Sequence, residues 1–201
     1  SLGQHFLKDE NIARNIVGAL SLQGDDLKVI EIGPGTGVLT KYLCELKGID
    51  LRLIEIDRES VAYLKGSYPN LKGKIIEADF LELDLDKIFP EPCAIIGNFP
   101  YNISSQIFFK VLDHRNKVHQ VVGMLQKEVA ERIAAPPGSK TYGILSVLLQ
   151  AFYHIELLFK VPPGVFFPPP KVMSAVIRLK RNEVKQLACD EIQFRKIVKQ
   201  A

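Results

Sequence analysis

The sequence predicts an α/β protein built on a mostly parallel, doubly wound sheet. Short apolar runs rich in β-branched residues alternate with segments of helical periodicity along most of the chain. A glycine-rich turn, Gly33–Gly37, joins the first apolar run to the first helical segment of that alternation. The last two apolar runs are separated by a proline-rich loop alone, so we expect them to pair antiparallel.

The expected strands share high apolar or β-branched content and lengths typical of strands. They are residues 27–32, 51–56, 74–78, 94–97, 120–125, 153–161 and 174–179. A strand followed each time by a helical segment favours parallel pairing, because each crossover helix returns the chain to the same end of the sheet.

The expected helices fill the gaps between these strands. They are residues 37–47, 58–67, 104–112, 128–134 and 143–151. In the first of them, Leu39, Leu43 and Leu46 recur at helical spacing, and Asp57 is placed to cap the second. One further helix, residues 9–20, precedes the first strand. We expect Asp9 to cap it and the helix to lie as a lid over the top edge of the sheet.

Composition is that of a soluble globular chain, with 47% hydrophobic and 24% charged residues. A chain of 201 residues is one domain by default, with room for a small appendage. No apolar run approaches the ~20 residues that span a bilayer, and the start lacks a signal-peptide pattern, so we expect a cytoplasmic protein with no membrane partner. The three cysteines lie far apart without metal or redox spacing, which predicts a reducing compartment and no metal site.

The net charge of +3 is unevenly distributed along the chain. Residues 178–201, the basic tail, carry seven basic and three acidic side chains. This tail is either a solvated helix face or a phosphate-binding extension, and the sequence leaves both interpretations open.

The glycine turn has the spacing G-x-G-x-G, with Val38 where a dinucleotide fingerprint requires its third glycine. No P-loop lysine follows it, and the turn resembles motif I of S-adenosylmethionine-dependent methyltransferases. Acidic residues recur at the ends of the first three strands, at Glu31, Glu55 and Asp79. Each acid alone is an ordinary cap or loop residue, but together they suit a cationic sulfonium cofactor. We expect Glu55 to accept from the ribose hydroxyls and Asp79 from the adenine amine.

A second motif, Asn98-Phe99-Pro100-Tyr101, ends the apolar run at residues 94–97. It places an amide, a rigid carbonyl and a flat ring at one lip of the sheet. These groups suit the exocyclic amine of a planar base, so the two motifs together predict a nucleotide-like cofactor beside a base to be modified.

Further segments make the chain resemble the ribosomal RNA adenine dimethyltransferase family, with its bacterial small-subunit members as the best match. The segments that carry the resemblance are 3–7, 33–37, 98–104, 124–129, 142–143 and 161–172. The resemblance implies a Rossmann-like fold with a seven-stranded sheet. It also implies dimethylation, at N6, of two adjacent adenosines in the 3′-terminal hairpin of small-subunit (16S) ribosomal RNA during ribosome biogenesis. The implied cofactor is S-adenosylmethionine, and the implied partner of the monomeric enzyme is the 30S pre-ribosomal subunit.

The resemblance also assigns roles to individual residues. The Asn98 side chain and the Pro100 carbonyl would accept hydrogen bonds from the amine, while Tyr101 stacks on the flipped base. Phe166 would close the other face of the base, with Phe167 as the competing candidate. The residues expected to line the cofactor are His5, Leu7, Gly33, Gly35, Glu55, Asp79 and Asn98.

The family pattern divides the chain into a catalytic domain, residues 1–181, and the beginning of a small helical C-terminal domain, residues 182–201. We expect that second domain to be truncated here. Two other functions stay open: a non-catalytic RNA-binding assembly factor that retains the fold, and a DNA adenine methyltransferase, which shares the Asn-x-Pro-Tyr chemistry. The intact glycine turn favours an enzyme over a non-catalytic assembly factor. The segments typical of the ribosomal RNA family argue against a DNA methyltransferase.

Overall fold

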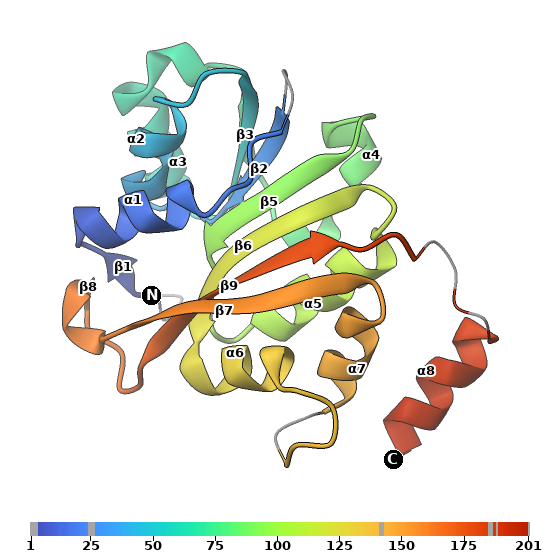
Figure 1. Ribbon diagram of the computed structural model, residues 1–201. Coiled ribbons are helices and arrows are strands. Elements are labelled where there is room, and N and C mark those ends of the chain that lie inside the picture. Colours follow the sequence, from blue (N-terminus) through green and yellow to red (C-terminus); the bar gives the residue numbers. More distant parts are fainter. Residues whose placement is uncertain (1–3, 24–26, 141–142, 185–186, 188, 201) are drawn as a thin grey trace.

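A seven-stranded sheet of order β4-β3-β2-β5-β6-β9-β7 forms the centre of the molecule (Figure 1). The structure is a computed structural model that describes residues 4–23, 27–140, 143–184, 187 and 189–200. Its large-sheet strands are β2 (Leu27–Ile32), β3 (Ile49–Glu55), β4 (Ile75–Glu77), β5 (Cys93–Asn98), β6 (Val118–Gln126), β7 (Tyr153–Val161) and β9 (Ser174–Arg181). Strands β2 to β6 pair in parallel, whereas β9 is antiparallel to both β6 and β7. The predicted fold class is confirmed, including the antiparallel closing strand.

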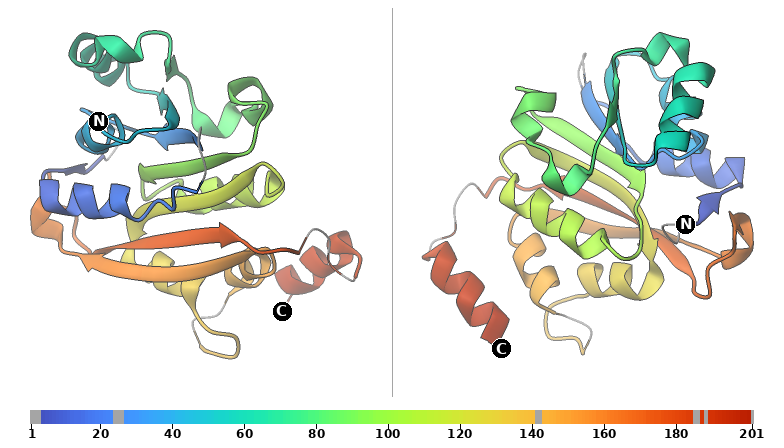
Figure 2. Two further views of the ribbon diagram at one scale, coloured as in Figure 1. Left: turned by 45° about the horizontal axis from the view of Figure 1, so that its top comes forward. Right: turned by 180° about the vertical axis from the view of Figure 1, so that it is seen from behind.

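Helices cover both faces of this sheet (Figures 1 and 2). On one face lie α1 (Glu10–Gly18), α2 (Val38–Leu43) and α3 (Arg58–Ser67). On the other lie α4 (Leu85–Ile88), α5 (Ser104–Asp113), α6 (Lys127–Ala134) and α7 (Ile144–Gln150). Because both faces of the central strands are buried, these strands read as continuous apolar runs rather than alternating ones.

Helix α1 packs on one face of the sheet, so the expectation that it lies as a lid over the top edge was wrong. Asp9 does cap it, accepting from the Ile12 backbone N–H at 3.0 Å. Its apolar stripe, Ala13, Ile16 and Val17, is buried in the core beneath β2, β5 and β6. The segment before the helix lies at the edge of the sheet instead.

That segment forms a two-residue strand, β1 (Phe6–Leu7), which pairs antiparallel with β8 (Phe166–Phe167). Elements this short carry no periodicity, so the sequence did not predict them, nor the four-residue α4. The same holds for the 3₁₀ turns η1 (Pro69–Leu71), η2 (Phe80–Glu82) and η3 (Pro163–Val165).

Helix α2 ends at Leu43, several residues before the predicted end. Beyond it, the Glu45 and Leu46 backbone N–H groups bond to carbonyls three residues back, so the chain tightens into turns that lead to Gly48. The other predicted helices and strands between β2 and β9 agree with the structure within two residues.

The basic tail begins in β9 and ends in α8 (Glu191–Gln200), which stands beside the main body (Figure 1). Its arginines are engaged within the chain. Arg178 pairs with Glu156 at 3.1 Å, and Arg195 with Asp113 at 3.0 Å. Arg181 donates to backbone carbonyls, including that of Phe152 at 2.9 Å. For these three arginines the structure favours contacts within the chain over phosphate binding. Among the described residues, no helix is both long and apolar enough to cross a membrane.

Candidate active site

The candidate site lies at the carboxyl edge of the parallel strands, where the strand order reverses direction. Strand β2 pairs with β3 on one side and with β5 on the other. The glycine turn after β2 and the Asn98–Tyr101 motif after β5 therefore adjoin, at the point where open α/β sheets bind ligands. The fold brings together two motifs that are about sixty residues apart in the sequence.

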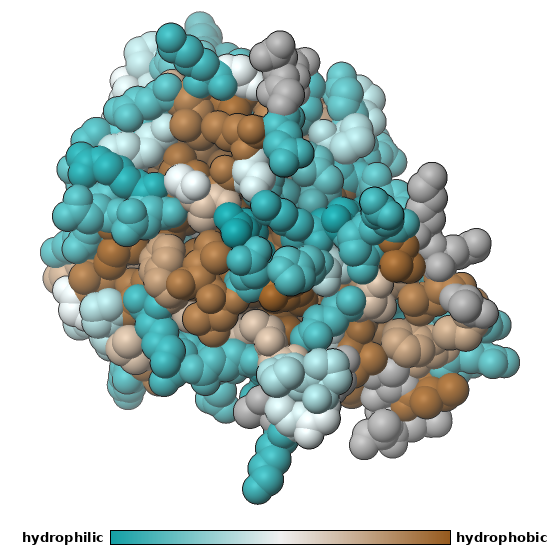
Figure 3. Space-filling view, in the orientation of Figure 1, coloured by the Kyte–Doolittle hydropathy of each residue, from teal (hydrophilic) through white to brown (hydrophobic). Residues whose placement is uncertain are grey.

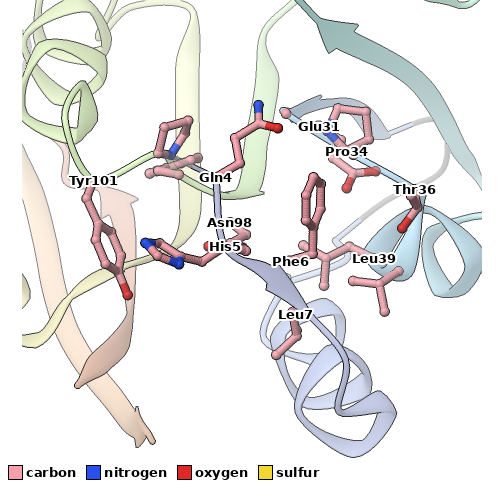
Figure 4. A pocket seen from close by; sticks show the side chains of 15 residues that line it. Gln4, His5, Phe6, Leu7, Glu31, Pro34, Thr36, Leu39, Asn98 and Tyr101 are labelled. Carbon is pink, nitrogen blue, oxygen red and sulfur yellow. The ribbon is translucent and has the colours of Figure 1, made fainter. Parts of the chain in front are cut away.

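Two adjoining hollows occupy this edge, with volumes of about 660 and 680 Å³ that include the solvent at their mouths. The first is drawn in Figure 4 and is lined by residues 4–7, Glu31, 33–36, Val38, Leu39 and 98–101. The second is lined by Gln4, residues 32–33, 54–56 and 78–81, Pro100 and residues 102–103. Gln4, Gly33 and Pro100 line both hollows, so an elongated ligand can extend from one into the other.

The glycine turn is held in a conformation that a side chain would disturb. Gly35 has φ of +57°, in the left-handed region. A Cβ atom built on it would lie 3.0 Å from the Phe6 ring, which covers the turn from β1. The missing side chain at Gly35 therefore leaves room for the Phe6 ring to pack on the turn.

Glu55 fixes this turn to the end of β3. Its carboxylate is only 2% exposed and accepts from the Gly35 N–H at 3.0 Å and the Asp57 N–H at 2.9 Å. Asp79 caps η2 by accepting from the Leu81 N–H at 2.9 Å and lines the second hollow with Glu55. Both acids lie where the sequence predicted them, at the ends of adjacent strands.

Glu31 is a buried acid of the first hollow. Its carboxyl accepts from the Thr40 hydroxyl at 2.5 Å. Burial raises the pKa of Glu31 to about 8; the Thr40 hydrogen bond lowers it in part, and the nearby charge of Glu55 raises it further. At neutral pH the folded chain thus keeps this carboxyl mostly protonated.

Asn98 ends β5 with its side chain tied to the N-terminal segment. The Asn98 Nδ2 atom donates to the His5 carbonyl oxygen at 3.0 Å. This bond fixes which way the amide points and leaves Oδ1 as the group that can accept from a ligand. The Pro100 carbonyl accepts from the Ile103 N–H at 3.2 Å and keeps a second lone pair available.

Phe99 anchors the motif in the core. Its side chain is buried, and its ring packs across Gly97 and Gly123 on the neighbouring strands β5 and β6. A Cβ atom on Gly123 would lie 2.4 Å from that ring. Asn98, which precedes Phe99, lines the first hollow, and Pro100, which follows it, lines both.

Tyr101 and His5 form the outer wall of the first hollow (Figure 4). The Tyr101 hydroxyl is hydrogen-bonded to the Ser174 hydroxyl, and burial raises the pKa of Tyr101. The ring centroids of Tyr101 and His5 are 5.6 Å apart, with the rings tilted by 37°. The His5 Nδ1–H donates to the Pro168 carbonyl at 2.7 Å, which ties the proline-rich loop to the same wall.

The two candidate stacking residues of β8 differ sharply in exposure. Phe166 is 3% exposed, opposite Leu7 in the β1–β8 pair, and packs in the core with it. Phe167 is 60% exposed. In this structure the ring of Phe166 does not line either hollow, so the structure does not bring it together with Tyr101.

Several lining residues were not identified from the sequence, and Ile56, Gln4 and Phe6 are three of them. Ile56 is 52% exposed although it is apolar, and it follows Glu55 directly in the second hollow. Its exposure is known only from the structure, because in the sequence Ile56 is the last residue of the expected strand 51–56. Gln4 and Phe6 had no local signal, because their places depend on the β1–β8 pairing.

The lining chemistry fits the predicted cofactor. The carboxylates of Glu55 and Asp79 line the second hollow and the mostly protonated Glu31 lines the first, whereas no Lys or Arg of the described chain lines either one. This arrangement suits a ligand with a positive centre and disfavours a phosphate-rich dinucleotide. In the part of the chain that the structure describes, no group of three or more His, Cys, Asp or Glu residues is placed to hold a metal ion.

Comparisons with known proteins place the chain in a family. A family model described as ribosomal RNA adenine dimethylase matches residues 1–201. The chain is 59% identical to the ribosomal RNA small subunit methyltransferase A of Cytophaga hutchinsonii, over 98% of the chain and 77% of that protein. It is 60% identical to the protein of the same name from Parabacteroides distasonis, over 99% of the chain and 74% of that protein.

Solved structures of two enzymes share the fold of this chain. A dimethyladenosine transferase from Plasmodium falciparum superposes with a TM-score of 0.84 at 30% identity, covering 97% of the chain and 70% of that structure. The 23S rRNA methyltransferase ErmE superposes with a TM-score of 0.82 at 28% identity, covering 96% of the chain and 77% of that structure. Since the family model matches residues 1–201 and the two small-subunit relatives share more than half of their aligned residues with it, the chain belongs to the ribosomal RNA adenine dimethylase family.

Proposed function

We propose that this chain transfers methyl groups to N6 of two adjacent adenosines in a 3′-terminal hairpin of small-subunit ribosomal RNA, forming N6,N6-dimethyladenosine during ribosome biogenesis. The observation that carries the proposal is the meeting of Asn98–Tyr101 with the glycine turn at one edge of the sheet. The names of the small-subunit relatives support the choice of RNA. The 30S pre-ribosomal subunit as partner, a monomeric enzyme and a cytoplasmic location belong to the proposal.

S-adenosylmethionine, when bound, supplies an electrophilic methyl group on a cationic sulfur. In this proposal Glu55 accepts from its ribose hydroxyls and Asp79 from its adenine amine, while Ile56 contacts the adenine ring. His5, Leu7, Gly33 and Gly35 line its other parts together with Asn98. Glu55 already accepts from the Gly35 N–H, so it sets the shape of the turn as well as meeting the ligand.

The target amine is a weak nucleophile because its lone pair is delocalised into the adenine ring. Asn98 Oδ1 and the Pro100 carbonyl accept hydrogen bonds from its two protons and direct the lone pair at the methyl group. Both acceptors are neutral, so the site acts by orientation and does not deprotonate the amine beforehand; the proton that the methylated nitrogen must lose passes to water after the transfer. Tyr101 stacks on the flipped base.

Closing the other face of the base is the proposed role of Phe166. That role requires the buried ring to become accessible when RNA binds, which in turn requires the β1–β8 pair to shift. The residues 1–181 act as the catalytic domain in this proposal, and α8 begins a helical domain that helps to hold RNA.

The test is methyl transfer from labelled S-adenosylmethionine to small ribosomal subunits that lack the modification, followed by nucleoside analysis. We expect N6,N6-dimethyladenosine at two neighbouring positions in the RNA. Binding of RNA and cofactor without any transfer would favour a non-catalytic assembly factor, and methylation of DNA in preference to RNA would contradict the substrate.

A further inference from the structure

At 60%, Phe167 is the most exposed phenylalanine or tyrosine of the described residues. It lies on the outer lip of the candidate site. Phe167 pairs with Phe6 across the β1–β8 strands, and the next residue, Pro168, accepts a hydrogen bond from His5. Apolar atoms reach the surface at the left of Figure 3, where Figure 1 draws β1 and β8.

A lysine covers this ring. The Lys8 Nζ atom lies 4.4 Å from the centroid of the Phe167 ring, and the Lys8 backbone N–H donates to the Val165 carbonyl at 2.8 Å. Lys8 is exposed, and no carboxylate of the described residues lies within salt-bridge distance of it. The same is true of Lys171, a few residues further along the loop. The surface at Phe167 therefore combines a flat aromatic ring with the positive charge of Lys8.

An exposed ring beside a lysine that forms no ion pair with the described residues is the surface chemistry that single-stranded RNA recognises. A base can stack on the ring in place of the ammonium group, which then becomes free to pair with a phosphate. The rigid loop favours such a role, because Pro168 and Pro169 leave the ring little freedom to lose on binding.

We propose that Phe167 and Lys8 form a second nucleotide position, which stacks the base next to the target adenosine and binds a phosphate of the same RNA strand. This inference rests on the proposed function. When one of two adjacent adenosines is flipped into the site, its neighbour loses a stacking partner, and Phe167 supplies a replacement.

The probe is an RNA hairpin with two adjacent loop adenosines, prepared also with 2-aminopurine on one side of them. We compare Phe167→Ala with Phe167→Tyr, which keeps the ring, and with Tyr63→Ala, which removes another exposed aromatic from α3. Steady-state kinetics, cofactor affinity and 2-aminopurine fluorescence are measured on each variant of the chain.

We expect Phe167→Ala to raise KM for the hairpin by about tenfold, while kcat at saturating RNA stays within about twofold of the original. Cofactor affinity stays unchanged, 2-aminopurine becomes brighter in the complex, and Phe167→Tyr behaves like the parent chain. Lys8→Gln should make log affinity fall less steeply with log salt, by about 0.7, as expected for one lost phosphate contact on a single strand.

An equal KM for Phe167→Ala and Tyr63→Ala, with equal fluorescence, would overturn the inference. So would a loss of cofactor affinity in Phe167→Ala, because the ring would then act on the site only through Phe6 and β1. Failure of the proposed function is distinguishable: the parent chain would then transfer no methyl group to small ribosomal subunits that lack the modification, whatever Phe167 does to hairpin binding.

Discussion

The side-chain amide of Asn98 donates to the backbone carbonyl of His5 at 3.0 Å, across a sequence separation of 93 residues. The bond joins the end of β5 to the segment that covers the glycine turn. It also decides the direction of the amide, because a carbonyl oxygen can only accept. An acceptor for the target amine is thus oriented before any ligand binds, which is the condition for catalysis by positioning.

Asn98→Ala should lower kcat by about 10²–10³-fold while RNA affinity changes little, since the amide is proposed to act mainly on the reacting amine. Single-turnover methylation and RNA titration measure the two quantities separately. Asn116→Ala, at an exposed position on the far edge of the sheet, is the matched control. Near-normal turnover of Asn98→Ala would remove this residue from the mechanism.

Glu55→Ala should weaken S-adenosylmethionine binding by about 1–3 kcal/mol, the range for lost hydrogen bonds to a charged group. The variant should also melt at a lower temperature, because the Gly35 and Asp57 N–H groups lose their acceptor. Calorimetric titration and thermal melts check both effects. Glu77→Ala, an exposed acid at the end of the next strand, should leave the affinity unchanged. Unaltered affinity in Glu55→Ala would refute the ribose assignment.

The buried Glu31 makes stability depend on pH. Its pKa is raised from 4.5 to about 8 by burial, so between these values the folded chain holds a proton that the unfolded chain has released. Stability must then fall as pH rises through this window, by up to about 1.4 kcal/mol per pH unit, and level off above it.

Glu31→Gln keeps the size of the side chain and an oxygen that can accept from Thr40. Its stability relative to the parent chain should therefore increase from pH 5 to pH 8. Urea unfolding at a series of pH values provides the measurement. A difference that stays constant over that range would show that Glu31 ionises normally in the folded chain.

Gly123→Ala should destabilise the chain by about 1–3 kcal/mol, because the new methyl group overlaps the Phe99 ring in a filled core. Activity should fall further than stability alone explains, since a displaced Phe99 shifts Asn98 and Pro100 with it. Gly66→Ala is the control: nothing lies within 4 Å of its added Cβ in α3, so it should stabilise by about 0.5–1 kcal/mol. Chemical denaturation and kcat of both variants test this, and equal effects would contradict the anchoring role of Phe99.

The sequence by itself determined the order and type of most elements and the two motifs of the site. Asp9 and Asp57 cap the helices that they were predicted to cap, and the glycine turn follows the strand that was expected to precede it. Each of these features depends on residues within a few positions of one another. The spacing of apolar residues, the capping side chain and the backbone freedom of glycine can therefore be recognised in a short stretch of sequence. The family and fold predicted from these motifs are confirmed.

Only the tertiary structure decided how distant segments meet. The β1–β8 pair buries Phe166 and exposes Phe167, although the two are sequence neighbours of the same type. The direction of the Asn98 amide depends on the His5 carbonyl. Two arginines of the basic tail, Arg178 and Arg195, form ion pairs with carboxylates that are distant in the sequence and come close only in the folded chain. Adjacent residues of a strand point to opposite faces, and which face is buried depends on what packs against it from elsewhere in the chain.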